Sequence, residues 1–83
     1  MMRYTVILDP EPDGSAFTVL VPLLPGVITF GSTIDEALVK AREAIACHLE
    51  GLANDGENLP IESPDLIVTG VEIELPVAAP ALA

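Results

Sequence analysis

The chain has very few positively charged side chains, with three Lys and Arg residues against thirteen Asp and Glu residues and a formal net charge of −10. Such a charge repels phosphate backbones, so we expect no direct binding to nucleic acid. The same field would speed association with a basic protein, and it would also keep the molecule soluble. The composition therefore leaves two interpretations open, a basic protein partner and a purely solubilising charge.

Cysteine and histidine are also scarce. The single cysteine, Cys47, cannot form an internal disulfide, and neither it nor the only histidine, His48, has further ligand-type residues close in sequence. We expect no metal or cofactor. A single domain of 83 residues buries only roughly 60 to 65% of the surface that its unfolded chain exposes. Oligomerisation is therefore the expected source of additional stability.

Long hydrophobic runs are missing. No apolar stretch approaches the roughly 20 residues that a membrane-spanning helix needs. The N-terminus has one positive charge, and its short apolar stretch stops at Asp9, unlike a signal peptide. We expect a soluble, cytoplasmic protein without a membrane partner.

Three short segments have the composition of strands. Residues 3–8 (RYTVIL) and 16–21 (AFTVLV) are rich in β-branched and aromatic residues. The stretch DPEPDGS between them favours a turn and predicts an antiparallel hairpin. Two prolines, Pro22 and Pro25, break the second strand, and residues 27–31 (VITFG) are predicted to form a third.

The clearest element is a helix within residues 32–56. Thr33 is expected to cap its N-terminus, with Glu36 completing a capping box, and the residues from Asn54 to Gly56 are expected to end it. At about 100° per residue, six apolar side chains form one stripe that should cover the sheet. They are Ile34, Leu38, Ala41, Ile45, Leu49 and Leu52.

The last predicted element is a strand over residues 66–75 (LIVTGVEIEL), where Val71 and Ile73 alternate with Glu72 and Glu74. This alternation predicts a half-buried strand with an acidic face. The expected fold is α+β, of the order β-β-β-α-β, with an antiparallel sheet and one helix on one of its faces. It is a single domain over residues 1–75, and the Pro/Ala tail, residues 76–83, is expected to be extended or disordered.

The stretch DPEPDG, residues 9–14, has the spacing with which a calcium loop opens, since Asp9, Glu11 and Asp13 alternate before Gly14. A calcium loop that begins at Asp9 needs a glutamate at its twelfth position, which is Leu20, and a helix on each side. Neither is present. We interpret the stretch as a turn whose carboxylates contribute to an acidic surface for a basic partner.

The candidates for catalysis are weak. His48 lies at the edge of the apolar helix stripe, and Cys47 diverges from it by about 100° around the helix, so the two do not form a couple. Strand-end carboxylates can hold Mg²⁺ in nucleases, but three basic residues could not hold the phosphates of the substrate. We therefore expect a protein that is not an enzyme.

The stretch VPLLPGVITFGSTIDEALVKAREAIACHLEGLANDGENLP resembles the N-terminal domain of the HicB antitoxin family, and the hairpin before it is similar as well. The resemblance covers about residues 3 to 75. Two departures are notable. The frequent Cys after the P-G turn is replaced by Val27, and no DNA-binding module follows, which puts DNA binding in doubt. The family's turn, cap and helix positions are matched by Pro22, Leu24, Pro25, Gly26, Gly31, Ser32, Thr33, Glu36, Ala37, Ala41, Ala44, Ile45, Leu49, Asp55, Gly56 and Pro60.

This resemblance implies a degenerate ribonuclease H-like sheet with a helix packed on it, in a protein that forms dimers or tetramers. It also implies a function as an antitoxin, which would bind a small basic RNA-cleaving toxin, HicA, and neutralise it by occlusion. An acidic surface would then occupy the RNA-binding face of the toxin. The family pattern does not supply the contact residues, and our candidates are Asp9, Glu11, Asp13, Glu72 and Glu74.

An alternative function is that of a homo-oligomeric structural or ligand-binding protein that has no toxin partner. Val39, Ala46 and Ala53 recur every seven residues on a second, weaker stripe of the helix, which could pack between subunits.

Overall fold

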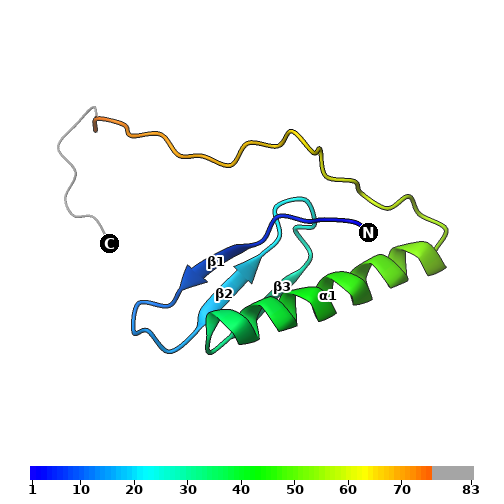
Figure 1. Ribbon diagram of the computed structural model, residues 1–83, viewed down its shortest axis with the longest axis horizontal. Helices are drawn as coiled ribbons and strands as arrows, with labels where there is room; N and C mark the ends of the chain where they lie inside the picture. Colours follow the sequence, from blue (N-terminus) through cyan, green and yellow to red (C-terminus); the bar gives the residue numbers. More distant parts are fainter. Residues whose placement is uncertain (76–83) are drawn as a thin grey trace.

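The protein was analysed as a computed structural model, which describes residues 1–75. Its elements are β1 (Ile7–Pro10), β2 (Phe17–Leu20), β3 (Ile28–Gly31) and α1 (Ile34–Asn54). The strands form one antiparallel sheet in the order β1-β2-β3, and α1 packs on β2 and β3 (Figure 1). The expected α+β arrangement of three antiparallel strands followed by one helix is confirmed. The expected Pro/Ala tail, residues 76–83, lies outside the described residues.

The predicted turn between the first two strands is also confirmed. The pairing of Pro10 with Phe17 closes the ladder, and just beyond it the N–H of Glu11 donates to the carbonyl of Ala16 at 2.8 Å. The N–H of Gly14 donates back to the carbonyl of Glu11 at 2.9 Å. Gly14 has a φ of 75°, which glycine adopts without a steric penalty. Local turn chemistry therefore explains this stretch.

The first strand begins later than predicted, at Ile7 instead of residue 3. Ile7 pairs with Leu20, and the next residue of the second strand, Val21, already belongs to a turn, where its carbonyl accepts from the N–H of Leu24 at 2.9 Å. Pro22, which follows, has no N–H to offer. Residues 3–6 consequently have no partner in β2, and both predicted strands of the hairpin are shifted or shortened.

The turn after β2 builds half of the core. The N–H of Leu24 donates to the carbonyl of Val21, and the N–H of Val27 donates to the carbonyl of Leu24, each at 2.9 Å. These two successive turns reverse the chain. Val21, Leu24 and Val27 are buried as one cluster, which packs against the half-buried Ile45 and Leu49 of α1. The two turns thus direct their apolar side chains toward the helix.

The predicted caps of the helix are found. The Thr33 hydroxyl accepts from the N–H of Glu36 at 3.0 Å, as expected for an N-cap. The Glu36 carboxylate accepts from the side-chain hydroxyl of Ser32 at 2.7 Å and not from the backbone N–H of Thr33, so only one half of the predicted capping box is formed. At the other end, Gly56 has a φ of 71° and donates its N–H to the carbonyl of Ala53.

The buried face of the helix matches most of the predicted stripe, because Ala41 is buried and Ile45 and Leu49 pack against the core. At the start of the helix the buried face is shifted, since Ala37 beside the stripe is buried, whereas Ile34 is 53% and Leu38 37% exposed. The reason is the close approach of β3, because a Cβ on Gly31 would lie 2.4 Å from the nitrogen of Ala37. Only small side chains fit at such a contact. Among residues 1–75, no helix is both long enough and apolar enough to cross a membrane.

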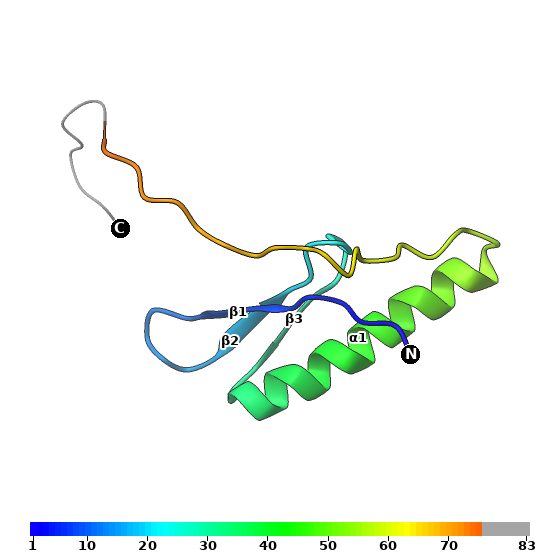
Figure 2. The ribbon, with the colours of Figure 1, turned by 45° about the horizontal axis from the view of Figure 1, so that its top comes forward.

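The predicted fourth strand is wrong for the isolated chain, since no strand follows α1 within residues 1–75. The N–H of Leu66 donates to the carbonyl of Ser63 at 3.2 Å in a turn that contains Pro64. Beyond this turn the chain runs extended and away from the sheet (Figure 2). Alternation predicts a strand only where a neighbouring edge is available. We call residues 66–75 the C-terminal arm.

Candidate interaction surface

One face of the sheet is left open by the helix. Side chains alternate along a strand, and Val19 and Leu8 point toward α1, so their neighbours point to the opposite face. Two of these neighbours, Ile28 and Phe30, are 67% and 69% exposed. Sequence reasoning placed both in a strand but did not predict that no element within residues 1–75 covers their face. We call this surface the open sheet face, and it consists of Ile7, Asp9, Thr18, Leu20, Ile28 and Phe30.

Three of the predicted acidic residues lie together at one end of the open sheet face. Asp9 faces Thr18 across the β1–β2 pair. The carboxylate of Glu11 accepts from the hydroxyl of Thr18 at 2.8 Å, and Asp13 accepts from the N–H of Ser15 at 2.9 Å. Asp9, Glu11 and Asp13, which we call the acidic hairpin, therefore border exposed apolar side chains.

The hydrogen bonds of the acidic hairpin have an electrostatic effect. The side chain of Ser15, and next its backbone N–H, hold the pKa of Asp13 below its ordinary value of 3.8. Both bonds stabilise the ionised carboxylate, so its negative charge is retained at neutral pH. Among residues 1–75, no three His, Cys, Asp or Glu side chains are grouped as a metal ion would require.

The other two acidic candidates do not join this group. Glu72 and Glu74 are exposed residues of the C-terminal arm, which leaves the body at a different place from the hairpin (Figure 1). The five acidic candidates therefore lie in two separate places in the single chain, and their contact with a basic partner stays a prediction. Sequence reasoning could not place Glu72 and Glu74 because it did not predict the path of the chain after α1.

The second predicted stripe of α1 lies in solvent. Val39, Ala46 and Ala53 are all exposed, and none of them belongs to either buried cluster. Their role at an interface between subunits stays a prediction.

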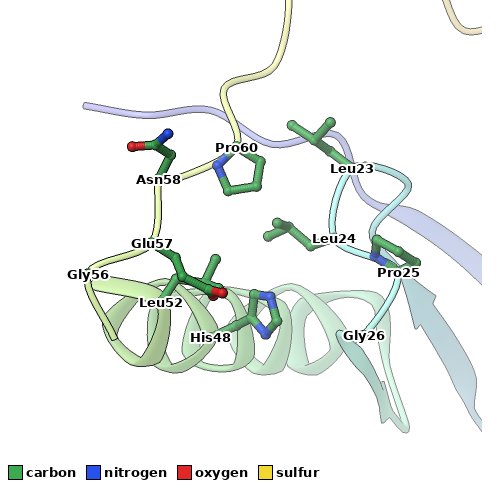
Figure 3. A pocket seen from close by; sticks show the side chains of 10 residues that line it. All are labelled: Leu23, Leu24, Pro25, Gly26, His48, Leu52, Gly56, Glu57, Asn58 and Pro60. Carbon is green, nitrogen blue, oxygen red and sulfur yellow. The ribbon is translucent and has the colours of Figure 1, made fainter. Parts of the chain in front are cut away.

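A hollow of about 690 Å³ lies between the end of α1 and the turn after β2, and the imidazole of His48 points into it (Figure 3). A Cβ on Gly26 would lie 3.7 Å from the Cε1 atom of His48, so the ring packs against this turn. Cys47 is exposed and does not line the hollow. The walls are mixed, with Leu24 and Leu52 beside Glu57 and Asn58. His48 therefore packs against the turn after β2, with Cys47 outside the hollow.

A second hollow, of about 680 Å³, separates residues 1–6 from α1. We call it the N-terminal groove. Its helical wall contains four residues of the predicted apolar stripe, which explains why Leu38 is partly exposed. Two basic residues, Arg3 and Arg42, also line it. The four residues are Leu38, Ala41, Ile45 and Leu49.

Comparison with known proteins agrees with this architecture. Residues 4–73 match the model of a family described as the HicB-like antitoxin of bacterial toxin–antitoxin systems. The crystal structure of the N-terminal domain of the antitoxin HicB from Burkholderia pseudomallei is similar, with a TM-score of 0.61 and 40% sequence identity over 69% of this chain and 66% of that one.

The similar sequences differ in how much of their own length matches this chain. A UPF0150 protein of Thermoplasma acidophilum is 41% identical over 80% of this chain and 94% of its own. An uncharacterised protein of Haemophilus phage HP1 is 36% identical, and the matched region is 62% of its length. The antitoxin HicB of Escherichia coli K12 is 35% identical over 76% of this chain and 45% of its own. The chain thus spans less than two thirds of the phage protein and less than half of this antitoxin.

Proposed function

The chain belongs to the HicB-like antitoxin family, and from this membership we propose that it binds and neutralises a small, basic, RNA-cleaving toxin of the HicA type. The observation that carries the proposal is the acidic hairpin at the end of the open sheet face, in a chain whose net charge is −10. Charge and apolar surface are thus adjacent on one side of the molecule.

The chemistry of the partner explains why these two features belong together. A protein that cleaves RNA must hold phosphates, and it does so with Lys and Arg side chains. Those cations would be attracted to Asp9, Glu11 and Asp13, while Ile28 and Phe30 would supply apolar area at the centre of the contact. The antitoxin and the RNA would then compete for one surface of the toxin. Occlusion requires no catalytic step from this chain.

In this proposal, the acidic hairpin and the open sheet face affect different steps of toxin binding. The exposed carboxylates act at long range and raise the rate of encounter, which depends on ionic strength. The apolar side chains act only on contact and slow the dissociation. Stable inhibition at physiological salt would therefore depend on the open sheet face more than on the acidic hairpin.

The experiment that tests the function measures RNA cleavage by a purified HicA-type toxin as the chain is added in increasing amounts. We expect cleavage to stop near a fixed molar ratio and RNA to lose its binding to the toxin at the same ratio. Continued cleavage at a large molar excess of a folded chain, in low as well as physiological salt, would overturn the proposal.

A further inference from the structure

The hollow between the end of α1 and the turn after β2, which we call the helix-end hollow, combines apolar and acidic side chains. Leu24 and Leu52 line its apolar part, and Leu23 of the same turn is 38% exposed. The carboxylate of Glu57 and the imidazole of His48 also line it (Figure 3). A group that fits this hollow therefore needs an apolar stem and a polar or positively charged head.

The end of α1 gives the helix-end hollow a negative potential. The C-terminus of a helix carries a partial negative charge, which Lys or Arg side chains in the last turn commonly offset. The last turn of α1 contains no basic residue. Two exposed carboxylates, Asp55 and Glu57, follow directly after Asn54, where α1 ends, and add two full negative charges. This end of the molecule therefore attracts cations.

The basic residues of the chain lie elsewhere. Two of the three, Arg3 and Arg42, line the N-terminal groove, and the third, Lys40, lies on α1 more than two turns before His48. None of the residues that line the helix-end hollow is a Lys or an Arg. The negative potential of the hollow is therefore available to a cation from another molecule.

Backbone hydrogen bonds hold both walls of the helix-end hollow in place. Two successive turns fix the wall that contains Leu24 and Gly26, and the ring of His48 packs against Gly26. On the other wall, the N–H of Glu57 donates to the carbonyl of Leu52 at 2.9 Å. A ligand would therefore meet a preformed site, and little free energy would be spent on ordering it.

The turn after β2 also connects the helix-end hollow to the open sheet face. Leu20 pairs with Ile28 at the end of the β2–β3 ladder, and both side chains belong to the open sheet face. The turn between them contributes Leu23 and Gly26 to the hollow. The acidic hairpin lies at the opposite end of β1 and β2 (Figure 1). A partner on the open sheet face would therefore reach the hollow by extending around this turn.

We propose that the helix-end hollow receives an arginine side chain of the basic toxin, an inference that rests on the proposed function. The methylene stem of arginine packs on apolar surface, which Leu23 and Leu52 provide, and its planar guanidinium pairs with a carboxylate, which Glu57 provides. Arginine is also more weakly hydrated than lysine, so it loses less on entering a hollow. The volume of about 690 Å³ leaves room for the toxin residues that flank the arginine.

The first test needs no toxin. N-acetyl-arginine amide is titrated into the ¹⁵N-labelled chain, and N-acetyl-citrulline amide, which has nearly the same shape but no charge, is the control ligand. We expect the arginine compound to shift the amide signals of Gly26, His48 and Glu57 in a saturable way, and the citrulline compound to shift them several-fold less. Equal shifts from the two compounds, or arginine shifts spread evenly over the other exposed carboxylates, would overturn the proposal.

The second test measures the affinity for a purified HicA-type toxin by calorimetric titration at physiological salt. Glu57→Gln should weaken binding about tenfold. Glu43→Gln is the matched control, because it removes the same charge from an exposed position of α1 outside the helix-end hollow. Circular dichroism establishes that both variants remain folded.

The outcomes separate this inference from the function on which it rests. If the unaltered chain binds the toxin and the two substitutions have equal effects, the arginine site is wrong and the proposed function stands. If the unaltered chain binds no toxin, the proposed function fails and the toxin is not the source of the arginine. Localised, saturable shifts with the arginine compound would then still identify the helix-end hollow as a site for arginine side chains.

Discussion

Gly31 and Ala37 approach each other so closely that a Cβ on Gly31 would lie 2.4 Å from the backbone nitrogen of Ala37. This contact joins the end of β3 to the first turn of α1. It holds the helix against one face of the sheet, with Ala37 and Ala41 buried beneath it. Ile28 and Phe30 therefore lie on the opposite face of the sheet, and the proposed function depends on these two side chains.

Gly31→Ala should destabilise the fold by about 1 to 3 kcal/mol, because backbone atoms must move to admit the methyl group. Urea denaturation followed by circular dichroism measures the change. Gly51→Ala is the control, since nothing lies within 4 Å of a Cβ there and the residue is helical. It should stabilise the protein by about 0.5 to 1 kcal/mol. Equal effects of the two substitutions would contradict the close contact.

Neutralising part of the acidic hairpin, with Asp9→Asn and Glu11→Gln together, should slow association with a basic toxin several-fold at low salt. The amide introduced by Glu11→Gln would be able to keep the bond to Thr18, so the turn should persist. Stopped-flow mixing measures the rate at low and high ionic strength. The control pair is Glu43→Gln with Glu50→Gln, which removes equal charge from an exposed part of α1. Equal slowing by both pairs would assign the effect to net charge alone.

Phe30→Ser should weaken toxin binding about tenfold or more, because Phe30 is 69% exposed at the proposed contact. Its exposure also means that the folded chain loses little stability on the change. Calorimetric titration measures the affinity, and thermal denaturation checks the fold. Ile34→Ser serves as the control, since Ile34 is 53% exposed but lies on α1. An unchanged affinity for Phe30→Ser would remove the open sheet face from the interface.

The carboxyl group of Asp13 should titrate below 3.8, and Ser15→Ala should raise its pKa toward that value. The folded-state pKa is the lower one, so the contribution of Asp13 to stability is present above the unfolded-state pKa and is lost as the pH falls through the folded-state pKa. Carbon-detected NMR of the side-chain carboxyl measures both variants. A pKa that does not move in Ser15→Ala would show that the hydroxyl does not stabilise the carboxylate.

The predictions from sequence that succeeded depend on local chemistry. The turn at Glu11–Gly14 follows from proline and glycine dihedrals, and the start of α1 follows from the hydroxyl of Thr33. In both cases the interacting atoms lie within a few residues of each other. The acidic hairpin was predicted for the same reason, since Asp9, Glu11 and Asp13 belong to one turn.

The predictions that failed depend on distant residues. The helix period correctly places Ala41 on the buried side, but the contact with Gly31 decided that Ala37 is buried at the start of the helix and that Ile34 is not. Alternation gives the apolar side of the arm, but the turn at Ser63 directs the arm away from the sheet, so Val71 and Ile73 pair with no strand within residues 1–75.

The sequence by itself thus determined the approximate places of three strands, the helix with its N-cap and the acidic turn, because dihedral preferences and short-range hydrogen bonds act between neighbouring residues. The tertiary structure alone decided which sheet face and which sheet edge stay uncovered. Burial depends on residues far apart in the chain, and here it leaves Phe30 and the arm exposed within residues 1–75.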